Sequence, residues 1–294
     1  MQKHRRRVVG TALLVVALVA LGLTASAQAK LVGNYTKFVQ CPYSNPEVRK
    51  CLYSTTNSGE VVLGSKKVPI EKPVVLQGGT LKAVEGTAKF VAASNGITLS
   101  KAPQNVPGGI LGIVPEASSP PLVKALIKFF LENSLTGVNS TLELAKPASE
   151  ITINETSLVG EEGTALKLPV KVHLENPFLG KNCFVGSSTT PIIWNLTTGE
   201  TNPPVPNKKI TGKAGQLEFL EEGSIAEIKE NVLVDNAWSA PTASGCGGIL
   251  SFLVTPIINA QLGSTAAGHN TAVLNNTLFT ASAAAVRENN ELNP

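Results

Sequence analysis

From residue 166 to residue 175 the chain reads Leu166-Lys167-Leu168-Pro169-Val170-Lys171-Val172-His173-Leu174-Glu175, with an apolar residue at every second position. Successive side chains of a β-strand point to opposite faces of the sheet, so this stretch predicts a strand with one buried face and one solvated face. Such alternation is typical of antiparallel sheets that cover a core on one side.

Similar short runs follow one another along the chain and are separated by Gly, Pro and Asn. The chain has 26 glycines and 19 prolines, which favours many strands joined by tight turns over alternating strands and helices. We therefore expect a mainly β fold, an antiparallel sandwich or barrel-like domain with one short apolar helix. The predicted strands are residues 60–63, 67–70, 73–77, 88–92, 140–145, 165–175, 191–196, 225–234 and 271–279.

The first 29 residues have the pattern of a secretory signal peptide. Lys3 and three arginines precede an apolar run from residue 8 to residue 23, and Ala27-Gln28-Ala29 offers a cleavage site. No later run approaches the roughly 20 apolar residues of a spanning helix. The sequence predicts cleavage of residues 1–29, a single mature domain over residues 30–294 with no transmembrane segment, and a location in the extracellular space or the cell envelope.

The leader also accounts for the positive net charge. It holds four of the 25 Lys and Arg residues, and the remaining 21 are matched by 21 acidic residues. A mature chain without net charge has no general electrostatic attraction to nucleic acid or to anionic membranes. We expect neither nucleic acid nor a charged membrane surface as the main partner.

Four cysteines lie in the predicted mature chain. An even number of cysteines in an oxidising compartment favours disulfides, and three pairings are possible. Cys41 and Cys51 flank a short stretch with a turn-like Asn45-Pro46 at its middle, which favours a local bridge and leaves Cys183 to pair with Cys246.

One segment departs from the β pattern. Ser118-Ser119-Pro120-Pro121 can begin a helix over residues 121–135 that Gly137 ends, and apolar residues fill most of its circumference. A Gly- and Pro-containing apolar loop precedes it. The helix and loop either plug one end of the domain or line a pocket for a lipid-like ligand. The candidate lining residues are Ile110, Leu111, Ile113, Leu122, Leu126, Ile127, Phe129 and Phe130.

Catalytic and metal-binding patterns are sparse. Asp235 is the only aspartate, the predicted mature chain has two histidines, and the serine-hydrolase, zinc-protease and phosphate-loop motifs are missing. The segment with Cys246, followed by His269 and Asn270, contains the residue types of a cysteine nucleophile, base and orienting group. A disulfide at Cys246 would exclude that role, so we predict no metal, no cofactor and no catalytic residue.

Two pairs of neighbouring glutamates and two tryptophans have a structural and a functional interpretation. Glu161-Glu162 and Glu221-Glu222 are each followed by glycine, which is typical of exposed turns and does not direct two carboxylates at one glycosidic bond. Trp194 and Trp238 can stack on a sugar, but tryptophans of β proteins more often belong to the core.

Several phrases of the mature chain resemble a group of uncharacterised secreted proteins of high-GC actinobacteria. These phrases lie at residues 41–46, 51–53, 168–170, 176–180, 183, 186–187, 196–199 and 245–247. The resemblance spans most of the mature chain and implies an envelope or extracellular setting, with no established activity or ligand.

The sequence is rich in apolar residues and has few polar groups of the kinds that catalyse reactions. We therefore expect a non-catalytic secreted or envelope protein that binds a hydrophobic, lipid-like ligand, an envelope component or another surface partner. The alternative is a secreted hydrolase of envelope or extracellular polymers, which requires Asp235, a glutamate or His269 to converge in one cleft.

Overall fold

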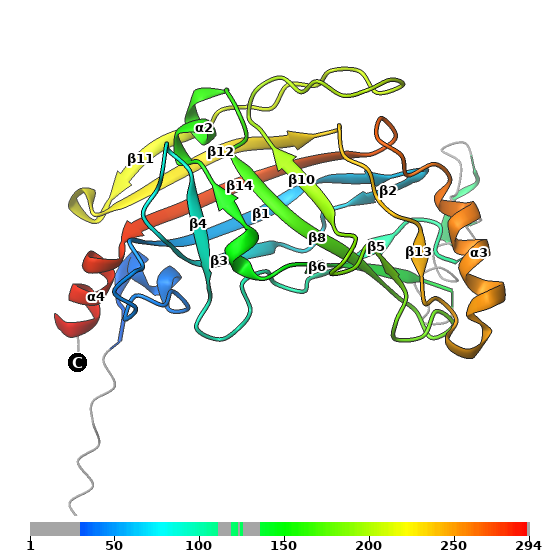
Figure 1. The fold of residues 1–294 in the computed structure, drawn as a ribbon, viewed down its shortest axis with the longest axis horizontal. Coiled ribbons are helices and arrows are strands. Elements are labelled where there is room, and N and C mark those ends of the chain that lie inside the picture. The colour runs from blue at the N-terminus through cyan, green and yellow to red at the C-terminus, as the bar shows by residue number, and fades with distance from the viewer. Residues whose placement is uncertain (1–29, 111–118, 123, 126–135, 293–294) are drawn as a thin grey trace, which may run out of the picture.

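The computed structural model describes residues 30–110, 119–122, 124–125 and 136–292. The described chain is mainly β, and every strand pair is antiparallel (Figure 1). The strands are β1 (Lys50–Leu63), β2 (Lys66–Pro69), β3 (Val74–Thr80), β4 (Ala88–Ala92), β5 (Pro103–Val106), β6 (Val138–Leu144), β7 (Thr152–Ile153), β8 (Leu166–Glu175), β9 (Phe184–Val185), β10 (Ile192–Leu196), β11 (Gln216–Leu220), β12 (Ile225–Asp235), β13 (Ala243–Ser244) and β14 (Thr271–Ser282).

Each of the nine predicted runs overlaps one of these strands, so the antiparallel β prediction is confirmed. Agreement is closest at β4, which has the predicted bounds, and at β8, β10 and β12, which each differ from the predicted bounds by one residue. The largest difference is β1, which starts ten residues before its predicted first residue. Its first part contains Ser, Thr and Asn residues and lacks the apolar alternation on which the prediction depended.

The sheet curls until it meets itself. Its strand order is β11-β12-β14-β1-β3-β4-β7-β8-β6-β5, and β10 pairs with β8. Just after β10, Thr197 and Val234 of β12 exchange two backbone hydrogen bonds of 3.0 and 2.8 Å. The path from β12 through β1 and β8 therefore returns to β12 through β10, which makes the body barrel-like.

The two arms that branch from this body also meet. Strand β2 extends from β1 and β5 extends from β6. The side-chain amide of Gln104 in β5 joins them, because its Oε1 accepts from the backbone N–H groups of Glu71 and Lys72 and its Nε2 donates to the Lys72 carbonyl. This buried amide accepts hydrogen bonds from backbone N–H groups and donates to a backbone carbonyl, as the backbone of a neighbouring strand would.

The apolar side chains form two cores. The larger core fills the inside of the curled sheet and contains Trp194 and Trp238, whose rings meet edge to face at 5.9 Å. The interpretation of both tryptophans as core residues is therefore confirmed. The smaller core lies at the opposite end from α3 (Ser251–Leu262), where η1 (Gly33–Phe38) and α4 (Ala283–Leu292) cover β1, β12 and β14 (Figure 1).

The helices differ most from expectation. Within 121–135 the structure describes Pro121, Leu122, Lys124 and Ala125, all helical, and the other residues lie outside the described ranges. Three unpredicted helices are α2 (Glu155–Gly160), α3 and α4, and short 3-10 turns are η1, η2 (Ala148–Glu150), η3 (Glu221–Gly223) and η4 (Gly248–Leu250). Helix α3 is apolar around most of its circumference, contains Pro256 and has only a narrow polar stripe at Ser251, Thr255 and Asn259, so its sequence is a weak helix signal.

Both predicted disulfides are present and no described cysteine is free. Cys41–Cys51 closes the local turn before β1, and Cys183–Cys246 joins residues 63 apart in the chain. In the chain-entropy model, loops of these lengths correspond to about 3 and about 4 kcal/mol of stabilisation respectively. Disulfides of this kind persist in oxidising compartments, which agrees with an extracellular protein.

Candidate functional site

The inside of the curled sheet contains an apolar cavity of about 120 Å³. An engineered cavity of about 150 Å³ lined by aliphatic and aromatic side chains is large enough to take up benzene. The cavity therefore has room for a small apolar molecule or part of a longer chain. Its walls come from β1, β2, β3, β5, β6, β8, β10, β12, β14 and α3.

The alternation that predicts the fold also builds the wall. On β8 the inward residues Leu166, Leu168, Val172 and Leu174 line the cavity, while the intervening Lys167 is exposed. The same period of two places Val74 and Leu76 of β3 on the cavity side and Val75 on the other side.

The cavity reaches from the centre of the molecule towards one edge. Its deepest lining residues are almost fully buried: Leu168, Trp194, Leu196 and Leu233 are at most 4% exposed. The apolar lining residues Val68, Ile70 and Val74, in and after β2 and at the start of β3, are only half-buried, as are Leu142 and Ile110. Among the described residues, the cavity wall is therefore least buried beside β2 and the start of β3.

Helix α3 covers the end of the cavity next to this edge. Its residues Ile258, Gln261 and Leu262 contribute to the lining. Gln261 Nε2 donates to the Ile110 carbonyl at 2.5 Å, and the backbone N–H of Ser65 donates to the Leu262 carbonyl at 2.7 Å. These hydrogen bonds connect the helix to the β1–β2 turn and to the turn that follows β5.

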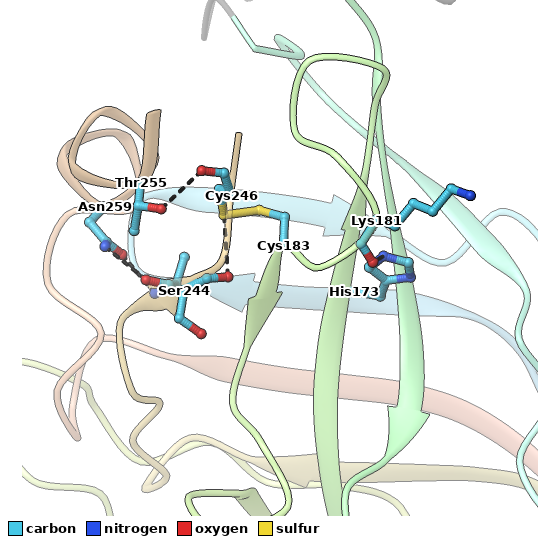
Figure 2. Close-up of a disulfide and its surroundings, with 8 residues drawn as sticks. His173, Lys181, Cys183, Ser244, Cys246, Thr255 and Asn259 are labelled. Atoms are coloured by element: carbon cyan, nitrogen blue, oxygen red, sulfur yellow. Dashed lines mark hydrogen bonds between the residues drawn. A yellow bond between two sulfur atoms is a disulfide. The ribbon is translucent and has the colours of Figure 1, made fainter. Parts of the chain in front are cut away.

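A second set of contacts fixes α3 through the Cys183–Cys246 disulfide (Figure 2). Thr255 Oγ1 donates to the Cys246 carbonyl, and the Asn259 side chain exchanges hydrogen bonds of 2.7 and 3.0 Å with the backbone of Ala243. Gly245 and Gly247 have φ angles of 71° and 92°, so the turn that brings Cys246 under the helix requires glycine. The disulfide therefore helps to position α3 over its end of the cavity.

The outer face of α3 is apolar as well. Phe252 is 71% exposed, and Leu253 and Ile257 are also exposed. From Asn236 to Val286 the chain has no Asp, Glu, Lys or Arg. Apolar surface of this kind is uncommon on soluble proteins. None of the helices in the described ranges has the length and apolar character needed to cross a membrane.

Most polar groups in the lining already have partners. Ser54 Oγ donates to Asn276 Oδ1 at 2.8 Å, and the Gln104 amide is bound to backbone groups as described above. Two groups differ. The indole N–H of Trp194 has no hydrogen-bond partner among the described residues, and Lys66 is the single charged side chain among the described lining residues.

Two of the predicted lining residues lie in the described ranges. Ile110 lines the cavity, whereas Leu122 is 81% exposed and is not among the lining residues. The other candidates, Leu111, Ile113, Leu126, Ile127, Phe129 and Phe130, lie outside the described ranges. The sequence argument missed the contributions of all the lining strands and of α3, although the alternation in several of these strands already indicated an inward face.

The hypothesis that Cys246 is a nucleophile is wrong, because Cys246 forms a disulfide with Cys183. His269 is exposed, and Asn270 is a buried structural residue whose Nδ2 donates to the carbonyls of Trp238, Thr265 and Ala266. Both carboxylate oxygens of Asp235 accept backbone N–H groups, from Asn195 at 2.7 Å and from Ala237 at 3.0 Å. These residues hold loops together and do not converge on a cleft.

The paired glutamates are turn residues, as their glycines indicate. Glu161 ends α2 with a φ of 56°, and Glu221 and Glu222 form the η3 turn. Glu221 Oε1 accepts hydrogen bonds from the backbone and side chain of Asn34. The described residues contain no group of three His, Cys, Asp or Glu side chains placed to hold a metal ion.

A charged cluster lies on the strands β6 and β8. His173 Nδ1 is 3.9 Å from Glu143 and 3.8 Å from Glu175, and its ring stacks on Phe184 at 4.3 Å. Burial raises the pKa of Glu143, but hydrogen bonds and attraction from Lys101 and Lys171 outweigh it and hold the pKa below its usual range. Glu143 is therefore a stably ionised, structural carboxylate.

The chain was compared with known families, curated proteins and solved structures. No family model matches it, and neither a curated relative nor a solved structure is similar to it at a significant level.

Proposed function

We propose that this is a secreted or cell-envelope binding protein without catalytic function, which holds a small hydrophobic molecule inside its curled sheet. The observation that carries the proposal is the cavity itself, which is bordered by strands and by α3 and is lined mainly by apolar side chains. Ligand sites are commonly preformed apolar cavities with a few placed polar groups.

The remaining chemistry supports binding over hydrolysis. The residues that a hydrolase would need are committed to other roles: Cys246 to a disulfide and Asp235 to two backbone amides. The predicted leader and both disulfides support an extracellular setting, where a carrier or sequestering protein meets apolar molecules that dissolve poorly in water.

Neighbouring residues of β3 provide the test. Val74 faces the cavity and Val75 faces away from it, and both are half-buried. Val74→Phe should fill part of the cavity, while Val75→Phe adds the same ring outside it. We use 1-octanol as a neutral probe and follow the fluorescence of Trp194, which lies in the cavity wall.

We expect 1-octanol to change the tryptophan emission of the unmodified protein in a saturable manner. Val74→Phe should weaken its binding at least tenfold, and Val75→Phe should leave it unchanged within twofold. Saturation should also raise the melting temperature, because a ligand at 100 times its Kd stabilises the folded state by about 2.7 kcal/mol. Equal weakening by both variants, or no saturable binding, would contradict the proposal.

A further inference from the structure

The cavity contains one feature that a purely apolar ligand would not need. Lys66, Val68 and Ile70 lie at alternate positions and all line the cavity, so Lys66 belongs to the inward face of the strand. Lys67 lies between them on the outward face, where it pairs with Glu60 at 2.6 Å. A lysine on the inward face of an apolar hairpin departs from the alternation of the strand.

Lys66 also has no counter-ion in the part of the chain that the structure describes. No carboxylate of the described residues lies within 4 Å of its ammonium group, in contrast to Lys67 and Lys171, which pair with glutamates. The other polar side chains of the cavity lining, from Thr, Ser, Gln and Asn, are uncharged. Burial alone lowers its pKa, because no nearby negative charge compensates the loss of water.

The position of Lys66 matches the least buried edge of the cavity. It begins β2, directly after Ser65, whose hydroxyl donates to the Gln261 carbonyl of α3 at 2.5 Å. Its side chain is half-buried, whereas Leu168 and Leu196 in the deeper wall are almost fully buried. A ligand that enters at this edge would place its last atoms beside Lys66 and its apolar part among the leucines.

We propose that the cavity takes an amphiphile, a short apolar chain with one anionic head group that forms an ion pair with Lys66. This proposal rests on the proposed function and adds the class of ligand. An anion at this position would supply charge-assisted hydrogen bonds to an ammonium group that has lost part of its hydration. The apolar chain would contribute burial, and the ion pair would fix its direction.

Octanoate and 1-octanol separate the two contributions, because they share a chain and differ in charge at neutral pH. We expect the full-length mature protein to bind octanoate at least tenfold more tightly than 1-octanol, a difference of about 1.4 kcal/mol. Lys66→Met should remove this preference. Lys66→Arg, which keeps the charge, and Lys67→Met, which alters the outward lysine, should both retain it.

Isothermal titration calorimetry at low and physiological salt measures these affinities, and thermal melts show that each variant folds. If 1-octanol binds but Lys66→Met leaves the preference for octanoate intact, the head-group proposal is wrong and the proposed function stands. If neither probe binds the unmodified protein, the proposed function fails as well. Equal affinities for both probes in the unmodified protein would also overturn the role of Lys66.

Discussion

Asp235 joins two strands at the point where the sheet closes. It ends β12, and its Oδ2 accepts from the backbone N–H of Asn195 in β10 while its Oδ1 accepts from that of Ala237. Burial raises the pKa of Asp235 above its ordinary value of 3.8, and the two hydrogen bonds offset this only in part. Asp235, the single aspartate of the chain, is therefore a structural residue, and its ionisation costs free energy in the folded protein.

Asp235→Asn should lower the free energy of unfolding by about 1–3 kcal/mol at neutral pH, because its NH₂ group cannot accept one of the two N–H groups. It should also change the pH dependence. Since the folded protein holds the Asp235 proton more tightly than the unfolded chain, stability falls as pH rises from 3.8 through the folded pKa. Urea denaturation over this pH range should show that Asp235→Asn lacks this decrease.

Glu143 serves as a control in the same experiment, because its pKa is shifted in the opposite direction. Its folded pKa lies below the ordinary value of 4.5, so its stabilisation is present above 4.5 and is lost as pH falls through the folded pKa. Glu143→Gln should therefore remove a rise in stability with pH. If both variants changed the pH profile in the same direction, the assignment of the two shifts would be wrong.

At the scale of elements, α3 is the helix whose two faces should behave most differently. Ile258 is 7% exposed and contacts the main core, whereas Phe252 on the outer face is 71% exposed. Ile258→Ala should cost about 2–5 kcal/mol of stability, because it opens a void in packed surroundings. Phe252→Ala should change stability by less than about 0.5 kcal/mol. Chemical denaturation compares the two, and similar costs would mean that the helix is oriented differently.

Strands and helices differ in how far the sequence predicts them here. The alternation in β8 is a local signal, so the sequence predicts both its bounds and its inward face. In α3 apolar residues cover most of the helix surface, and two of the hydrogen bonds that orient it join Gln261 to Ile110 and Leu262 to Ser65, which are distant in sequence. Such tertiary contacts override weak local preferences and are not visible in the pattern.

For the whole molecule, the class of fold and both disulfides follow from turn residues, alternation and cysteine spacing. The closure of the sheet does not, because it depends on a pair of hydrogen bonds between Thr197 and Val234 and on the buried carboxylate of Asp235. The cavity is a consequence of that closure. Its lining is therefore shared among strands that the sequence predicts one by one but cannot place relative to each other.

The position of Lys66 shows the same limit of sequence-based prediction at the cavity. Lys66 lies just before the predicted strand of residues 67–70, so the sequence pattern assigns it to neither face. Only the register of β2 with β1, in which Val61 and Val68 are partners, shows that Lys66 lies on the inward face. A single residue of register shift would place Lys67 there instead and remove the basis for an anionic ligand.

The central claim is that a small hydrophobic molecule binds inside the sheet, and methyl NMR with 1-octanol tests it most directly. The account predicts that the methyl resonances of Leu168, Val172 and Leu196 shift in a saturable manner, because these side chains line the cavity. The methyl groups of Leu253, on the exposed face of α3, should not shift. Shifts confined to Leu253 and its surface neighbours, or no saturable shift at the cavity residues, would contradict the account.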